Sequence, residues 1–312
     1  METIRLGRTG LEVSVAGLGC GGKSRLGLGT GHDEAHATAI VEHAIDCGIN
    51  LIDTARLYGT EAAVGKAIRG KRDRVVLSTK GAPVRGDELV SASDLATSLE
   101  DSLTSLDTDY VDVFHLHGLT LDAYPHAIET LLPELQRQQQ AGKIRFLGVT
   151  EVFARDTTHR TIQEVVVGGH FDVVMVGFNL LNPSARTHVF PHATQRDIGT
   201  MIMFAVRRAL SQPDVLADLV AGLVAEGVVH ESEVDAGDPL GFVRDFADVS
   251  SLLEAAYRFC RHEPGAGVIL TGTGDAAHLD ANVRAILAPP LPAMLTERLN
   301  RIFGHVDSVS GN

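Results

Sequence analysis

Short apolar stretches alternate with longer segments of helical periodicity along most of the chain. Eight stretches have the β-branched or apolar character of buried strands: VSVAGL, INLID, RVVLSTK, YVDVFHL, KIRFLGV, FDVVMVGF, TMIMF and GVIL. Between most of them apolar residues recur every three or four positions, as over 33–46, 91–105 and 125–140. Eight strands alternating with helices in a chain of 312 residues predict an α/β fold, a (β/α)8 TIM barrel.

Two later regions show no regular period. One runs from Phe204 to about Val249 and ends in the acidic stretch HESEVDAGDPLGFVRD, and the other is the tail after Pro289. Insertions after barrel strands commonly shape substrate pockets, and a solvated surface excursion explains these regions equally well. No internal repeat or low-complexity linker divides the chain, so we expect one domain over residues 1–312.

Composition narrows the class of protein. The chain is 44% hydrophobic and 21% charged, which is typical of a soluble catalytic domain. It has neither an apolar run of the ~20 residues that a membrane span needs nor a signal-peptide core, so we expect a cytoplasmic protein without a membrane partner. Three scattered cysteines predict no disulfide framework and no zinc knuckle. The net charge of −13 disfavours nucleic acid as a partner, and nothing in the sequence indicates an oligomeric state.

Four polar side chains fall at or just after the ends of three successive predicted strands. Asp53 and Tyr58 lie in LIDTARLYGTE, Lys80 ends VVLSTK, and His117 ends YVDVFHLH. In a barrel, the carboxyl ends of the strands carry the chemistry. A phenol, with a pKa near ~10, becomes a useful proton donor when a neighbouring cation stabilises its anion. Lys80 supplies that cation, Asp53 keeps it charged, and His117 can hold a carbonyl oxygen, which predicts a site for carbonyl reduction.

The order of several segments along the chain resembles the aldo-keto reductase family. These segments are IRLGRTGLEVSVAGLGCG, GINLIDTARLYG, VDVFHLH, GKIRFLGVT, FNLLNPSA and TGTGDAAHLDANV. The resemblance implies a TIM barrel whose bottom is closed by an N-terminal β-hairpin that turns at Gly7 to Gly10. It also implies NAD(P)H as cofactor and reversible hydride transfer between the nicotinamide C4 and an aldehyde, ketone or sugar, with Tyr58 as general acid and base.

The same resemblance implies positions that hold the cofactor. Thr150 and Glu151 stand where the family binds the nicotinamide carboxamide, Phe204 stands where an aromatic ring stacks on the nicotinamide, and Met175 replaces a glutamine that also contacts the carboxamide. Arg207 or Arg208 would meet the pyrophosphate. The expected cofactor-binding residues are Gly19, Cys20, Gly21, Thr150, Glu151, Met175, Phe204, Arg207, Arg208, Gly272, Thr273, His278 and Asn282.

The adenosine end of the predicted cofactor site departs from the family pattern. Where NADPH-selective members have a lysine and an arginine for the 2′-phosphate, this chain has Gly272 and His278. Thr273 and Asn282 remain as family-like contacts. Because histidine is mostly uncharged at neutral pH, we expect NAD(H) to be used at least as well as NADP(H).

Competing patterns are present. Gly17, Gly19 and Gly22 satisfy G-x-G-x-x-G, but no helix pattern begins at the last glycine, which disfavours a Rossmann site. His115 and His117 alternate on one strand, as in metal-dependent hydrolase barrels, yet Lys80 precedes them, whereas in that family the lysine follows. His32 and His36 are spaced for a helical metal site but lack a third ligand, so no metal is expected.

Substrate-binding residues are expected at the rim of the barrel: Arg25, Arg56, His115, Tyr124 and Phe153. This mixed polar and aromatic set suits a sugar or another hydroxylated carbonyl compound, and the absence of tryptophan excludes a pocket built from that residue. A second class of function stays open, because barrels of the resembling family also serve as non-catalytic, nicotinamide-binding regulatory subunits.

Overall fold

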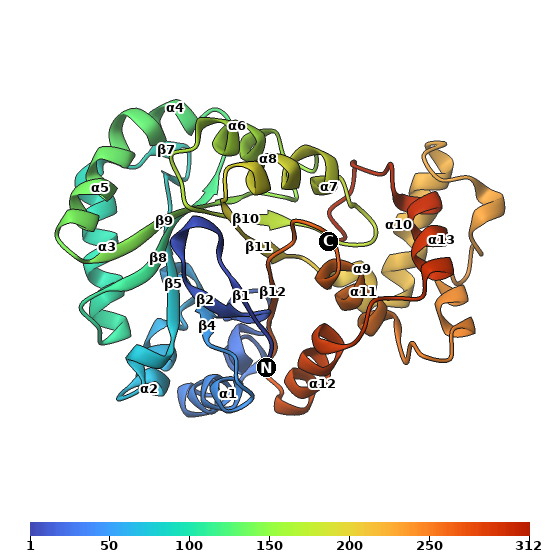
Figure 1. The fold of residues 1–312 in the computed structure, drawn as a ribbon, viewed down its shortest axis with the longest axis horizontal. Helices are drawn as coiled ribbons and strands as arrows, with labels where there is room; N and C mark the ends of the chain where they lie inside the picture. Colours follow the sequence, from blue (N-terminus) through green and yellow to red (C-terminus); the bar gives the residue numbers. More distant parts are fainter.

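A computed structural model describes all 312 residues and confirms the predicted barrel (Figure 1). Eight parallel strands close into a ring in which each strand pairs with the next along the chain and the last pairs with the first. They are β3 (Ala16–Gly19), β4 (Leu51–Asp53), β5 (Val76–Gly81), β8 (Val111–Leu119), β9 (Ile144–Glu151), β10 (Val173–Gly177), β11 (Gly199–Met203) and β12 (Val268–Thr271). The Rossmann alternative is thereby excluded, because the glycine motif leads into an irregular 3-10 segment, η2 (Arg25–Thr30), and not into an α-helix.

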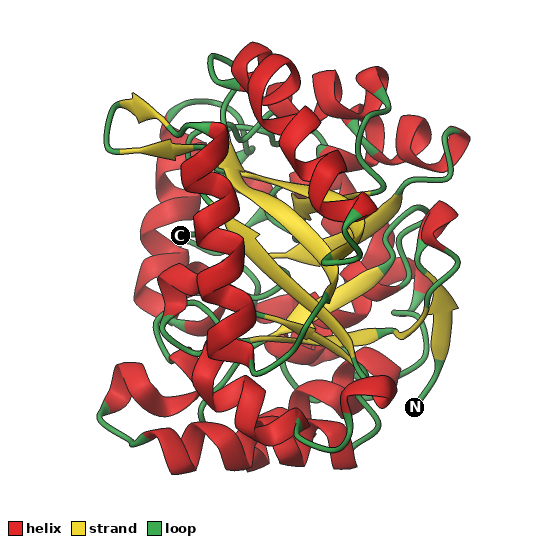
Figure 2. Cartoon of the chain, turned by 90° about the vertical axis from the view of Figure 1, so that its left-hand side faces the viewer, coloured by secondary structure: helices red, strands yellow, loops and turns green.

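Helices surround the strands on the outside (Figure 2). They are α1 (Glu34–Asp46), α2 (Glu61–Ile68), α3 (Ala92–Leu106), α4 (Tyr124–His126), α5 (Leu132–Gln140), α6 (Arg160–Gly168), α7 (Ala185–His188), α8 (Phe190–Gln195), α9 (Arg208–Ser211), α10 (Pro213–Ala225), α11 (Leu252–Arg261), α12 (Ala276–Leu287) and α13 (Ala293–Phe303). Several start at side-chain caps. The carboxylates of Asp33 and Asp275 accept the N–H groups of His36 and His278, each three residues further on. None of the helices combines the length and the apolar character that crossing a membrane requires.

The N-terminal hairpin lies under the barrel, as predicted. It consists of β1 (Thr3–Arg5) and β2 (Glu12–Ser14), which pair antiparallel. Its side chains Leu6, Leu11 and Val13 are buried in one cluster with the lowest inward-facing residues of the strands, including Leu51, Val76, Val113, Val173 and Val268. The hairpin turn is fixed to the barrel because the Arg8 N–H donates to the Asp197 carbonyl just before β11. Apolar side chains therefore fill the barrel floor, and no ligand can enter from that end.

Polarity inside the barrel increases toward the carboxyl ends of the strands. On β5 the inward-facing residues change from Val76 to Ser78 to Lys80, while Leu77 packs outward into the large core under the helices. The strand register places Asp53 beside Ser78 and Lys80 beside His115. Because parallel strands share one direction, their polar ends meet at the same mouth.

The region expected to be irregular after Phe204 is more ordered than predicted. It contains α9, α10 and the 3-10 turns η6 (Glu231–Glu233) and η7 (Gly241–Asp245). In α10, Pro213 occupies the first turn and Leu216, Val220 and Leu223 are buried at helical spacing. The tail after Pro289 forms α13, which packs against this region (Figure 1). Sequence analysis missed these helices because short loops separate them.

Candidate active site

A buried ion pair lies at the upper end of the barrel interior. Lys80 Nζ donates to both carboxylate oxygens of Asp53, at 2.7 and 2.6 Å, and to the carbonyl of Thr54 at 2.8 Å. Ser78 Oγ donates to the same carboxylate at 2.7 Å. The Lys80 and Asp53 side chains are 0% and 4% exposed. Their pairing therefore compensates both charges for the hydration that they lose on burial. All three donors of the ammonium are occupied, which fixes its position.

Tyr58 covers this pair from the loop after β4. Its ring centroid lies 5.0 Å from Lys80 Nζ, and its hydroxyl lies 3.3 Å from Nε2 of His117. The two rings meet edge to face, at an interplanar angle of 86°. A Cβ on Gly21 would lie 2.7 Å from the Tyr58 ring, so only glycine allows the phenol to take this position. The structure thus brings the four predicted side chains into one cluster.

The electrostatics of the cluster suit proton transfer from oxygen. Burial raises the pKa of Tyr58, and the adjacent Lys80 charge acts in the opposite direction by stabilising the phenolate. Burial disfavours the charged form of Lys80 and by itself lowers its pKa. The neighbouring Asp53 and Tyr58 more than offset this effect, so the pKa of Lys80 is raised. Burial, assisted by Lys80, lowers the pKa of His117 to about 3. At neutral pH the cluster therefore holds one fixed cation, a neutral phenol and a neutral imidazole.

A cavity of about 1000 Å³ begins at this cluster and extends to the start of α12. Asp53 and Tyr58 form part of its wall. Ten of the predicted cofactor residues line it: Gly19, Gly21, Met175, Phe204, Arg207, Arg208, Gly272, Thr273, His278 and Asn282. The guanidinium carbon of Arg207 lies 4.1 Å from the centroid of the Phe204 ring. The lining combines an aromatic ring, two arginines and the N-terminal turn of α12, which suits a dinucleotide.

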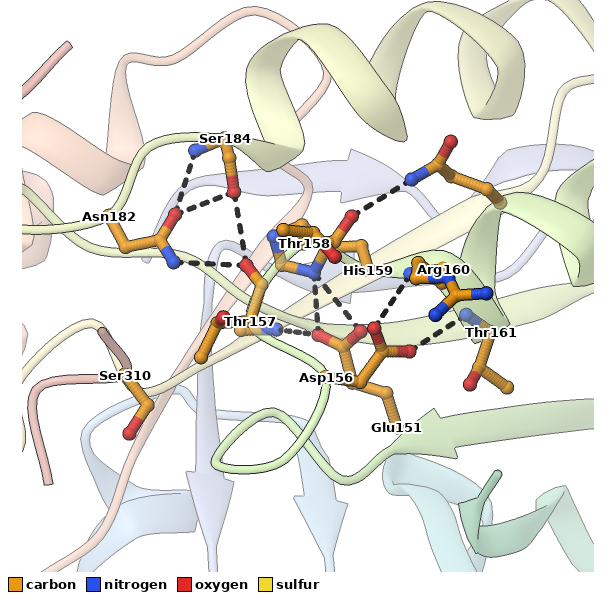
Figure 3. Close-up of polar contacts among 12 residues, drawn as sticks. Glu151, Asp156, Thr157, Thr158, His159, Arg160, Thr161, Asn182, Ser184 and Ser310 are labelled. Atoms are coloured by element: carbon orange, nitrogen blue, oxygen red, sulfur yellow. Dashed lines mark hydrogen bonds and ion pairs between the residues drawn. The ribbon is translucent and has the colours of Figure 1, made fainter. Parts of the chain in front are cut away.

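Three predicted cofactor residues do not line the cavity. The Cys20 side chain is fully buried, with its sulfur nearest the Leu18 carbonyl. Thr150 is buried and its hydroxyl accepts the N–H of Gly118 at 2.7 Å. Glu151 points to the other side of its strand, where it pairs with His159 Nδ1 at 2.9 Å and accepts the N–H of Gly177 at 2.7 Å (Figure 3). Adjacent strand residues face opposite sides, so Thr150 and Glu151 cannot both reach the lumen.

The five expected rim residues are not brought together at the mouth. His115 is fully buried inside the barrel at the level of Lys80, and neither ring nitrogen has a hydrogen-bond partner. Arg56 is exposed and pairs with Asp101 of α3, while Tyr124 packs against α6 with its hydroxyl toward the Glu164 carbonyl. Two further residues complete the set: Arg25 lies exposed in η2 outside the cavity lining, and Phe153 is 1% exposed. The prediction of a rim formed by these side chains is wrong in its geometry.

Phe153 nevertheless lies directly behind the cavity. Its ring stacks on His159 at 5.1 Å and meets the edge of Phe204 at 5.5 Å. The buried pair of Glu151 and His159 therefore supports Phe204 through Phe153. Burial raises the pKa of Glu151. Glu151, His159 and Phe153 therefore support the Phe204 ring from behind, and none of the three lines the cavity.

Sequence analysis missed a group of lining residues on α11, on α12 and just before α11. They include Ser250, Ser251, Glu254, Tyr257 and Arg284. Tyr257 donates or accepts a hydrogen bond with Thr271 Oγ1 at 2.9 Å, and Asn282 donates to the same oxygen. Which of these residues line the cavity depends on how the two helices pack. Strand-end rules cannot find such a surface.

His32 and His36, which are spaced for a helical metal site, lie with their rings stacked at 4.0 Å. His36 Nε2 contacts the carbonyl of Gly274 at 2.7 Å. Asp33, between the two histidines, caps the start of α1.

Comparison with known proteins agrees with this geometry. The sequence model described as "Aldo/keto reductase family" matches residues 18–303. The chain belongs to the aldo/keto reductase family. An uncharacterized oxidoreductase of Bacillus subtilis (strain 168), YqkF, is 26% identical over 294 residues, which is 91% of each chain. Among solved structures, the holo form of aldo-keto reductase AKR11C1 from Bacillus halodurans has a TM-score of 0.71, with 26% identity and 96% of each chain covered.

A second solved structure shares the fold at lower identity. It is an aldo-keto reductase from Klebsiella pneumoniae in complex with NADPH, with a TM-score of 0.70 and 23% identity. The alignment covers 99% of this chain and 98% of the other. The barrel with its hairpin and the helices after β11 is therefore the architecture of this aldo/keto reductase.

Proposed function

We propose that this aldo/keto reductase catalyses reversible hydride transfer between a nicotinamide cofactor and a carbonyl or carbinol carbon, with Tyr58 as the general acid and base. The observation that carries the proposal is the position of the Tyr58 hydroxyl. It lies 3.3 Å from His117 Nε2, next to the buried Lys80 cation, and Tyr58 forms part of the cavity wall. An aldehyde, ketone or free sugar entering there would present its oxygen to the phenol.

In the proposed reduction, Tyr58 gives its proton to the oxygen that becomes an alkoxide. Lys80 stabilises the resulting phenolate, and Asp53 holds the ammonium in place through two hydrogen bonds. His117 is neutral, because its pKa is about 3, so it orients the oxygen as a neutral hydrogen-bonding group. In oxidation the phenolate takes the alcohol proton back. These are the roles predicted for Asp53, Tyr58, Lys80 and His117.

The cavity residues fit a nicotinamide dinucleotide. Phe204 offers an aromatic ring, Arg207 and Arg208 supply cations, and the N-terminal turn of α12 offers backbone N–H groups. The bound nicotinamide would donate or accept the hydride. The Klebsiella relative with NADPH bound supports this cofactor class. Met175 brings a thioether where a polar group would hold the carboxamide, so the cofactor is held mainly by the other lining residues.

We further propose that NAD(H) is used at least as well as NADP(H). At the adenosine end, His278 is 77% exposed and Gly272 has no side chain, so no lysine or arginine stands in the first turn of α12. Initial rates with NADH and NADPH at equal concentration test this. We expect His278→Arg to raise the relative rate with NADPH by about tenfold, through one added charged contact with the phosphate. A hundredfold preference of the wild type for NADPH would contradict the proposal.

The catalytic role of Tyr58 is tested with Tyr58→Phe, which removes the hydroxyl and keeps the ring. We expect turnover to fall by about 10²–10⁴, the usual contribution of general acid catalysis. Substrates come from a screen of aldehydes, ketones and free sugars, followed by absorbance of the reduced cofactor. Tyr124→Phe is the matched control, because its hydroxyl contacts only a backbone carbonyl outside the cavity. Turnover like the wild type in Tyr58→Phe would disprove the assignment.

The screen also separates the proposed activity from its alternatives. No turnover with any carbonyl compound, together with tight nicotinamide binding, would favour a regulatory subunit. Activity that depends on added metal and not on a nicotinamide would favour the metal-dependent hydrolase barrel. A small-molecule substrate and the cytoplasm remain the partner and location that we propose.

A further inference from the structure

Three side chains with metal-binding atoms meet on the outside of the barrel, away from the cavity. His43 lies in the last turn of α1, Cys47 caps the end of that helix, and Asp280 lies in α12. The two helices lie side by side near the N-terminus, although His43 and Asp280 are 237 residues apart in the chain (Figure 1). Of the three, none lines the cavity, so the cluster is separate from the candidate active site.

The three donor atoms converge on one point. His43 Nε2 lies 2.7 Å from Asp280 Oδ1, Cys47 Sγ lies 3.4 Å from the same oxygen, and Cys47 Sγ lies 3.7 Å from His43 Nε2. Bond lengths of about 2.0–2.3 Å in tetrahedral zinc sites imply ligand separations of about 3.4–3.6 Å. The two distances from the sulfur, 3.4 and 3.7 Å, lie within about 0.1 Å of that spacing. Only the nitrogen and oxygen would have to move apart, by about 0.7 Å, as the ion replaces their hydrogen bond.

A nucleophilic triad explains this arrangement less well. In such a triad the imidazole uses one nitrogen for the carboxylate and the other for the nucleophile. Here the same nitrogen, Nε2 of His43, faces both Asp280 and Cys47. Convergence of all three donors on a shared position is instead what a coordinated cation requires.

We propose that His43, Cys47 and Asp280 form a binding site for a divalent cation of the zinc type. Sulfur, imidazole nitrogen and carboxylate oxygen together select a borderline-soft ion over Mg²⁺ or Ca²⁺, which prefer oxygen ligands. The His43 and Asp280 side chains are 37% and 39% exposed, so solvent can supply the fourth ligand. The protein therefore supplies three ligands, and the bound ion can exchange with the solution.

Charge around the cluster balances the ion. The thiol of Cys47 loses its proton to solvent when the sulfur–metal bond forms, and the thiolate and the Asp280 carboxylate then neutralise a divalent cation. Asp46, on the exposed side of α1, adds a further negative charge beside Cys47, while Arg284 on α12 lies near Asp280. The histidine binds as the neutral imidazole through Nε2.

An ion here would tie α12 to α1. On α12, Asp280 stands between His278 and Asn282, which both line the cavity. Fixing Asp280 therefore limits movement of the helix whose first turn forms the proposed adenosine end. The site would stabilise the fold and take no part in the chemistry at Tyr58.

The experiment uses the full chain without an affinity tag, stripped with a chelator and titrated with Zn²⁺ and with Co²⁺. We expect one equivalent of Zn²⁺ per chain by calorimetry, and a thiolate-to-cobalt charge-transfer band with Co²⁺. We also expect Zn²⁺, and not Mg²⁺, to raise the Tm by a few degrees, since an ion that binds only the folded chain stabilises it.

Cys47→Ser, His43→Gln and Asp280→Asn should each weaken Zn²⁺ binding by at least tenfold, as expected when one of three ligands is lost. Cys47→Ser should also abolish the cobalt band. Asp46→Asn is the matched control, because it removes an adjacent charge and keeps all three donors. Circular dichroism verifies that each variant is folded. Absence of stoichiometric Zn²⁺ binding to the wild type, or equal binding by wild type and Cys47→Ser, would overturn the proposal and leave the cluster as a hydrogen-bonded contact between helices.

Discussion

Replacing Asp53 by Asn removes one charge from the buried ion pair and changes little else in shape. Lys80 Nζ would keep its hydrogen bond to the Thr54 carbonyl and one to the amide oxygen, but it would lose the only carboxylate that it contacts. The ammonium has no exposed surface through which water could replace that charge. The substitution therefore leaves an unpaired buried cation, or forces Lys80 to give up its proton.

The size of the effect follows from this choice. Breaking a buried ion pair by removing one partner costs about 3–5 kcal/mol. Lys80 can avoid this cost by losing its proton, because full burial can lower the pKa of a lysine by about 3–5 units. Since the pKa of Lys80 would then lie below its unfolded value, the unfolded state binds more protons between the two values. The stability of Asp53→Asn should therefore rise with pH across that window, which begins between about pH 5 and pH 7 and ends near pH 10.

Urea unfolding at pH 6, 7.5 and 9 measures the stability, and steady-state kinetics at the same pH values measures turnover. We expect a loss of about 3–5 kcal/mol at pH 6 that shrinks at pH 9. We also expect a loss of turnover that grows toward pH 9, because a deprotonated Lys80 no longer stabilises the Tyr58 phenolate. Asp101→Asn is the matched control, since it breaks the exposed pair with Arg56, in which the two side chains are about half exposed, at a cost of about 0–1 kcal/mol. If Asp53→Asn costs no more than Asp101→Asn and its midpoint does not vary with pH, the reasoning about a buried charge is wrong.

Two further predictions concern the barrel interior. Gly148→Ala would place a Cβ 2.3 Å from Nδ1 of the buried His115 ring, so thermal unfolding should show a loss of about 1–3 kcal/mol, and an unchanged Tm would contradict the packing. His117 has a pKa of about 3, below the ordinary histidine value. As the pH drops from about 6.5 toward 3, the unfolded state binds a proton at this residue and the folded state does not, so the stability falls. At pH 5 this contributes a loss of about 2 kcal/mol, and denaturant titrations should show a shallower pH dependence in His117→Gln.

The order of strands and the meeting of the catalytic cluster could be predicted from sequence because both depend on local patterns. Each strand is a short apolar stretch, and parallel pairing forces the residues at successive strand ends to one mouth. Asp53, Lys80 and His117 each occupy such an end. Tyr58 follows in the loop, and its position then depends on the space that Gly21 leaves. A single-domain organisation and the cytoplasmic location stay predictions.

Helix packing was the part that local patterns did not determine. The region from Phe204 to about Val249 was expected to be irregular, although PDVLADLVAGLVA within it forms α10, with proline in its first turn. Lining residues such as Ser251 and Tyr257 reach the cavity only because α11 lies beside α12. No spacing rule connects positions in two helices when a strand lies between them.

Depth within the barrel explains the remaining errors. His115 and His117 face the same side of β8, so both were placed at the mouth, but they differ by one layer. The register pairs His115 with Lys80 on one neighbouring strand and with Gly148 on the other. The large ring fits there because Gly148 has no side chain, and the ring then fills the barrel interior at the level of Lys80. His117, one layer higher, is the first imidazole that can contact Tyr58. His115, two residues nearer the barrel floor, therefore packs in the core. The register of the neighbouring strands is needed to distinguish it from His117, which can contact a substrate.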